Sequence, residues 1–164
     1  MAGWREATAR ITHGVLRGAF LLALIALGSL FVVQIALIAA RSVLAVTFAW
    51  LPELATALLA ATIVFATGWT VSQGRHVAVD VWSSRWTNGQ RRWRDRAGFF
   101  LLALPMAGTI GWTAWPYIAQ AWAFREGSAE LSGLPGLFLV KSLLGIFAGL
   151  LMLGAMALAL RRSP

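Results

Sequence analysis

Residues 18–40, GAFLLALIALGSLFVVQIALIAA, contain no acidic, basic or histidine side chain over 23 consecutive positions. Uncharged blocks of similar length follow at 54–74, 97–124 and 142–160. About 20 apolar residues, each rising about 1.5 Å along an α-helix, cross the roughly 30 Å hydrocarbon core of a bilayer. The sequence therefore predicts an all-α integral membrane protein, a four-helix bundle in a single domain over residues 1–164. The predicted spans are approximately residues 18–40, 51–73, 97–118 and 135–160.

The composition excludes a water-soluble fold. Of the 164 residues, 59% are hydrophobic and 12% are charged, whereas soluble domains carry about 25% charged residues. The first block has one alternative, a cleaved signal peptide, because it follows Arg5, Arg10 and Arg17 and ends near Ala39 and Ala40. Its 23 residues exceed the roughly 7 to 15 of a signal-peptide core, so we favour a retained helix. Because there is no cysteine, the chain offers neither a disulfide framework nor a thiolate metal site.

Basic residues outside the predicted spans are concentrated on one side of the membrane. Eleven lie on the side of the termini and the loop 75–96, namely Arg5, Arg10, Arg17, Arg75, Arg85, Arg91, Arg92, Arg94, Arg96, Arg161 and Arg162. On the other side the net charge is zero, because three basic residues are matched by three acids, namely Arg41, Arg125 and Lys141 by Glu53, Glu126 and Glu130. By the positive-inside rule, both termini and the loop 75–96 face the cytoplasm. Since the arginines lie in short loops beside spans, the bilayer explains the net charge of +8 and no nucleic-acid partner is expected.

Local signals set the expected helix ends. Trp50, Pro52 and Glu53 suit the start of the second helix, because they provide an interfacial aromatic ring, a first-turn proline and an acid at the positive end of the helix dipole. The first helix is expected to continue past Arg41, since residues 42–48 contain no Gly or Pro.

Two features predict how the later helices bend and pack. Pro105 and Pro116 predict a kink in the third helix unless neighbouring groups satisfy the freed carbonyls. Gly145 and Gly149 form a GxxxG pattern in the fourth helix, where small residues let helix backbones approach closely. The pattern leaves open whether that contact forms within this subunit or against a partner.

The loop 75–96 carries apolar residues at helical spacing, namely Val79, Trp82 and Trp86. The pair Asn88-Gly89 indicates a turn before the basic run RRWRDR. We interpret the loop as containing an amphipathic helix that lies in the cytoplasmic interface between the second and third spans. A solvated basic loop is the alternative.

Lys141 is the charged residue that lies farthest inside a predicted span. Pro135 precedes it by six residues, or about 9 Å along a helix, so its ammonium can reach the outer headgroup region. An ion pair with Glu126, Glu130 or Glu53 is our preferred interpretation over a role in ion passage.

The sequence lacks the patterns of an enzyme or of a complete transporter. His13 and His76 are the only histidines, and both lie outside the spans, where they could not act as axial haem ligands in the bundle. Catalytic motifs, an internal repeat and paired broken helices are all absent from the sequence. We therefore expect a partner subunit with no cofactor and no metal. The alternative hypotheses are the membrane anchor of a redox enzyme complex and a small homodimeric efflux carrier.

Several stretches resemble one family. Arg41 is followed by Trp50 and Glu53, then by QGRHVAVDVW at 73–82 and by EGSAELSGLPGLFLVKSLL at 126–144. These stretches are similar to the small membrane subunit, the DctQ type, of tripartite ATP-independent periplasmic (TRAP) transporters, and the likeness covers about 40–160. The resemblance implies a multi-pass subunit of the bacterial inner membrane that serves as a scaffold for a large DctM-type transport subunit. It also implies a periplasmic substrate-binding protein, an organic acid or similar solute, and sodium sites that lie in the large subunit.

The resemblance also implies which residues lie at subunit or lipid interfaces. These candidates are Arg41, Trp50, Glu53, Arg75, His76, Asp80, Trp82, Trp86, Glu126, Glu130, Ser132 and Lys141. The chain departs from the family pattern where Arg75 directly precedes His76 and where Leu54, not a second acid, follows Glu53. His76 and Asp80 are spaced i to i+4, so we expect a side-chain pair on a short helix and no metal site.

Overall fold

The computed structural model describes residues 2–73, 88–129 and 132–160. Its helices are α1 (Ala2–Ser42), α2 (Trp50–Ser72), α4 (Asn88–Gly98), a π-helical turn (Phe99–Ala103), α5 (Leu104–Phe124) and α6 (Leu137–Leu160). The helical stretches that are long and apolar enough to cross a membrane are Arg10–Ser42, Trp50–Ser72, Arg96–Phe124 and Leu137–Ala159. The prediction of four membrane-spanning helices is therefore confirmed in the described part of the chain.

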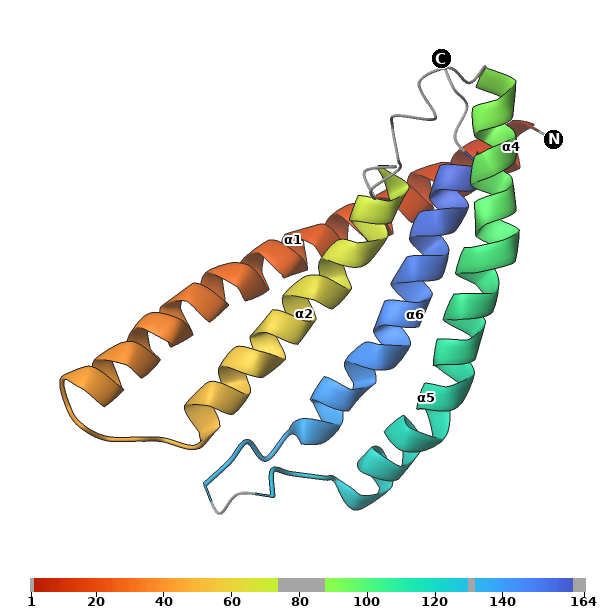
Figure 1. The fold of residues 1–164 in the computed structure, drawn as a ribbon. Helices are drawn as coiled ribbons and strands as arrows, with labels where there is room; N and C mark the ends of the chain where they lie inside the picture. The colour runs from red at the N-terminus through yellow and green to blue at the C-terminus, as the bar shows by residue number, and fades with distance from the viewer. Residues whose placement is uncertain (1, 74–87, 130–131, 161–164) are drawn as a thin grey trace.

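The four long helices lie side by side in the order α1, α2, α6 and α5 (Figure 1). Helix α2 packs between α1 and α6, and α5 packs on the other side of α6. The four predicted helices form an open layer, with α1 and α5 at its two edges (Figure 1). The physical reason is that lipid tails are as apolar as leucine, so no hydrophobic force drives α1 and α5 together to close the bundle.

The tightest packing in the layer joins α2 to α6. A Cβ atom added at Gly154 would lie 3.0 Å from the Cα of Gly68, and one added at Gly68 would lie 2.8 Å from the carbonyl oxygen of Leu150. Leu16 of α1 is fully buried beside this contact and packs with Val64 and Leu150. The missing side chains of the two glycines therefore allow the two backbones to touch.

The GxxxG pattern in α6 does not form that contact. A Cβ atom at Gly145 would meet the Cδ1 atom of Ile118 at 3.4 Å, and one at Gly149 would meet nothing within 4 Å. Gly154, which lies beyond the pattern, is the glycine that packs against α2.

Helix α1 continues past Arg41 by one residue, to Ser42, and does not extend through residues 43–48. Ala45 adopts a left-handed backbone with φ of 52°, and the amide of Val46 donates to the carbonyl of Ala40 over 3.1 Å. A left-handed residue after the last turn ends a helix, and alanine can adopt this conformation at a modest energetic cost. The absence of Gly and Pro was therefore not sufficient to continue the helix.

A helix leads into the third span, and an irregular turn follows it. Helix α4 starts at Asn88, where we predicted a turn, because asparagine and glycine are also favourable at the start of a helix. The π-helical turn ends two residues before Pro105, and there the amide of Leu104 donates to the carbonyl of Phe99. Figure 1 shows α5 bending in its second half, which contains Pro116. The predicted interfacial helix around Val79, Trp82 and Trp86 lies outside the described residues.

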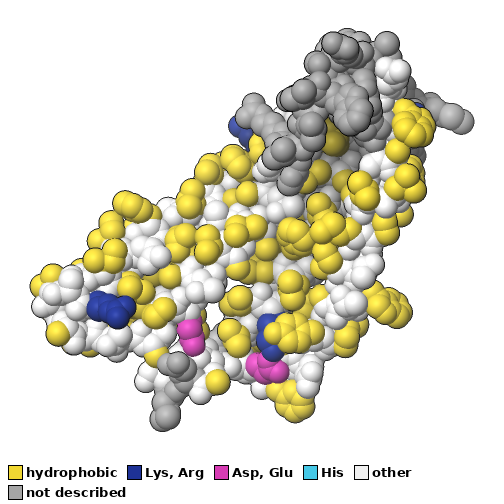
Figure 2. All heavy atoms as spheres, in the orientation of Figure 1, with side chains coloured by type: hydrophobic (Ala, Val, Ile, Leu, Met, Phe, Trp, Pro, Cys, Tyr) yellow, Lys and Arg dark blue, Asp and Glu magenta, His cyan; other side chains and the backbone are white. Residues whose placement is uncertain are grey.

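Most of the apolar surface of the layer is not covered by the chain itself. Only 11% to 22% of the residues in the most apolar window of each span are buried. Hydrophobic side chains accordingly cover much of the face in Figure 2, and acidic side chains and a neighbouring basic one gather at the end where loops join α1 to α2 and α5 to α6. Within the described residues, these apolar faces and this polar end are surfaces that lipid or another protein can contact (Figure 2).

Candidate functional site

The loop 125–136, between α5 and α6, forms the core of the polar end. Arg125 caps α5 with a left-handed φ of 45°, which turns the chain out of the helix. The amide of Ser128 then donates to the carbonyl of Leu134 over 2.9 Å, and the amide of Phe138 donates to the carbonyl of Glu126 over 3.2 Å. These two hydrogen bonds fold the loop back onto the start of α6.

Glu53 ties this loop to α2. Its carboxylate, in the first turn of α2, accepts hydrogen bonds from the hydroxyl of Ser128 and from the amide of Leu134, the second over 2.7 Å. Gly133 leaves the space for this approach, because a Cβ atom there would overlap the Ser128 side chain and lie 2.8 Å from the Oε2 atom of Glu53. We call Glu53, Ser128, Gly133 and Leu134 the loop clamp. It joins the start of α2 to a segment that lies more than 70 residues away in the sequence.

Lys141, the fifth residue of α6, forms an ion pair with Glu126. Its Nζ atom also lies 4.1 Å from the centre of the Tyr117 ring, a distance at which an ammonium is attracted by an aromatic face. The predicted ion pair is confirmed with Glu126, and of the other two acids considered Glu130 lies outside the described residues. Tyr117 is a contact that the sequence did not indicate.

A second set of contacts joins the end of α5 to the start of α6. The indole Nε1 of Trp122 donates to the hydroxyl of Ser142 over 2.8 Å. The rings of Trp122 and Phe138 pack edge to face with their centres 4.8 Å apart. Together with the Lys141 ion pair, these contacts hold α5, the loop and α6 as one unit.

The other candidate residues are dispersed or lie outside the described residues. Arg41 and Ser132 are exposed, and Trp50 is 40% exposed with its ring centre 6.3 Å from that of Phe48. The candidates outside the described residues are Arg75, His76, Asp80, Trp82, Trp86 and Glu130. Within the described ranges, no group of three or more His, Cys, Asp or Glu side chains is placed to hold a metal ion. The arrangement is therefore one of structural hydrogen bonds and ion pairs.

We expect Lys141 and Glu126 to be energetically coupled. Their side chains are 15% and 31% exposed, so solvent screens this pair less than the surface pairs that contribute about 0.2–1 kcal/mol. A double-mutant cycle with Lys141→Met and Glu126→Gln, measured by thermal unfolding in detergent, should give a favourable coupling energy clearly different from zero. As a control, Lys141→Met combined with Thr56→Ala should be additive, because the Thr56 hydroxyl donates to the carbonyl of Pro52 in its own helix. A coupling energy near zero for Lys141 and Glu126 would show that the ion pair does not stabilise the loop.

Comparison with known proteins places these features in one family. The family model described as "Tripartite ATP-independent periplasmic transporters, DctQ component" matches residues 30–163. No curated protein and no solved structure matches the chain at a significant level. The matched residues include the loop clamp, the Lys141–Glu126 ion pair and the glycines between α2 and α6. The chain is thus a multi-pass membrane protein that belongs to the DctQ family, the small permease component of TRAP transporters.

Proposed function

We propose that this subunit acts as a fixed scaffold for a large, DctM-type transport subunit in the inner membrane of a bacterium. A periplasmic substrate-binding protein would deliver an organic acid or similar solute, and a sodium gradient would drive its uptake through the large subunit. Membership of the DctQ family supports the assignment to such a transporter.

The observation that carries the scaffold proposal is the open, apolar layer. Phe31, Leu102 and Trp112, which come from different parts of the layer, are each at least 69% exposed. A helix layer with so much uncovered apolar surface is well suited to pack against another membrane protein along its length. The loop clamp and the Lys141–Glu126 ion pair engage three charged groups of the polar end, Glu53, Glu126 and Lys141, which supports a structural role for them.

The charge distribution supports an orientation with both termini in the cytoplasm. In that orientation the loop clamp and the Lys141–Glu126 ion pair lie on the periplasmic side. The polar end would then face the substrate-binding protein. The alternative of a redox-enzyme anchor receives no support from the family match.

Affinity purification from the native host tests the proposal. The tagged chain should bring down a much larger membrane protein, and liposomes that contain both should take up solute only with the binding protein and an inward sodium gradient. An unrelated tagged four-helix membrane protein serves as the control. If the chain never copurifies with a large membrane protein, or if the large subunit alone transports at the same rate, then the scaffold proposal is wrong.

A further inference from the structure

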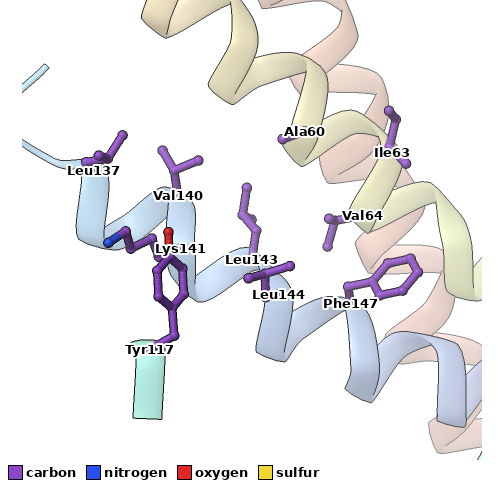
Figure 3. A pocket seen from close by; sticks show the side chains of 10 residues that line it. All are labelled: Ala60, Ile63, Val64, Tyr117, Leu137, Val140, Lys141, Leu143, Leu144 and Phe147. Carbon is purple, nitrogen blue, oxygen red and sulfur yellow. The ribbon is translucent and has the colours of Figure 1, made fainter. Parts of the chain in front are cut away.

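An apolar groove of about 560 Å³ lies between α2 and α6 on the side of the polar end (Figure 3). Ala60, Ile63 and Val64 line it from α2, and Val140, Leu144 and Phe147 line it from α6. Tyr117 and Lys141 lie beside its outer part. Because it is built from residues of two spans, the groove opens into the region that lipid tails occupy.

The shape of the groove follows from the two contacts that join α2 to α6. At one end, the backbones touch at Gly68 and Gly154. Toward the other end the two helices diverge (Figure 1), and the loop clamp at Glu53 connects the start of α2 to the segment that leads into α6. The lining ends nearer the loops than that glycine contact, at Val64 of α2 and Phe147 of α6, which pack in the buried cluster around Leu16. The groove is therefore closed at this cluster and open toward the loops.

The length of the groove matches one leaflet of a bilayer. Its lining on α6 runs from Leu137 to Phe147, ten residues apart, which is about 15 Å along a helix. The hydrocarbon core is about 30 Å thick, so one leaflet is about 15 Å deep. A transmembrane helix of another protein would need a groove that continues through both leaflets, and here the buried cluster at Val64 and Phe147 closes it. An acyl chain of one leaflet fits this length.

The polar groups at the mouth suit a zwitterionic headgroup. The ammonium of Lys141 can donate to a phosphate oxygen, and the carboxylate of Glu126, whose side chain is 31% exposed, can accept from a primary amine. A choline headgroup has no N–H to donate to the Glu126 carboxylate. A purely anionic headgroup carries no ammonium at all, so it would offer Glu126 no cation of its own.

We propose that this groove binds one phospholipid with a phosphoethanolamine headgroup, its acyl chain between α2 and α6 and its headgroup at the Lys141–Glu126 ion pair. The bound chain would fill the space that the diverging helices leave. This inference does not rest on the scaffold proposal, because it concerns only the surface of this subunit.

Photocrosslinking in native membranes that contain the assembled complex tests the proposal. The probe is phosphatidylethanolamine with a diazirine in one acyl chain, and the adducts are mapped by mass spectrometry. We expect adducts to concentrate on the peptides that contain residues 60–64 and 140–147. Ala60→Phe should lower their yield about tenfold, which corresponds to a clear loss of affinity. Leu59→Phe is the matched control, since Leu59 is 48% exposed and lies outside the groove.

A second groove-filling variant and two further lipid probes complete the test. Ile63→Trp is a second groove-filling variant at a side chain that is 57% exposed, so it should fold normally and still reduce the adducts. Phosphatidylcholine and phosphatidylglycerol probes should crosslink less than phosphatidylethanolamine, and Glu126→Gln should remove that difference. Equal adduct yields with and without the groove-filling variants would overturn the site, and equal yields for the three probes would overturn the headgroup assignment. If the adducts form with the purified subunit in liposomes but are absent from the assembled complex, the large subunit occupies the groove and the lipid proposal is wrong.

Discussion

Gly154→Ala should weaken the contact between α2 and α6 more than any other single methyl group added to α6. The new Cβ atom would lie 3.0 Å from backbone atoms of Gly68, and a backbone cannot rotate away as a side chain can. Overpacking of this kind costs about 1–3 kcal/mol, which exceeds the roughly 1 kcal/mol that alanine gains over glycine in helix propensity. Thermal unfolding of the purified subunit, followed by tryptophan fluorescence, should show a lower midpoint.

Gly149→Ala is the matched control for this prediction. It adds the same methyl group to the same helix at a position where nothing lies within 4 Å, so the unfolding midpoint should stay the same or rise. If Gly149→Ala also leaves the isolated subunit stable but prevents assembly, the GxxxG face contacts the large subunit. Equal destabilisation by the two variants would contradict the close approach at Gly68 and Gly154.

Glu53→Ala should release the loop 125–136 from α2. The variant removes the acceptor for the Ser128 hydroxyl and for the Leu134 amide. Hydrogen bonds to a charged group are stronger than those between neutral groups, so the loop should be held less firmly against α2. Hydrogen exchange should become faster at the amide of Leu134, which donates directly to Glu53.

Two further variants serve as comparisons for Glu53→Ala. Glu53→Gln keeps one side-chain oxygen and should give an intermediate exchange rate at Leu134. Thr56→Ala removes a hydroxyl one turn further along α2 that bonds only its own helix, through the carbonyl of Pro52 at 2.9 Å, and should leave the loop unchanged. Protection of the Leu134 amide that survives Glu53→Ala would mean that the loop holds its conformation without the clamp.

The ion pair of Lys141 shows how far a single sequence can go toward a site. An ammonium inside an apolar span requires a counter-ion. The sequence therefore limited the possible partners of Lys141 to the acidic residues on the same side of the membrane. The choice of Glu126 depends on the loop, because the Phe138 amide and the Glu126 carbonyl bring the two segments together. That choice could not be made from spacing alone.

The loop clamp was not predicted. Glu53 was recognised as a favourable residue for the start of a helix, and Ser128 and Gly133 as parts of a family motif, but nothing in the sequence joins them. Their contact depends on how α2 lies relative to α6, and that arrangement depends in turn on Gly68 and Gly154. The same holds for Tyr117 beside Lys141.

The amino-acid sequence was sufficient to locate four spans, because the cost of placing a charge in hydrocarbon is large and acts on each residue separately. It could not distinguish a layer from a bundle, since side chains that face lipid and side chains that face another helix are equally apolar. The order of the helices, the glycine that joins α2 to α6, the loop clamp and the groove depend on how side chains from distant segments fit together. These features arise only when the chain is folded, because steric fit is a property of pairs of surfaces and not of single residues.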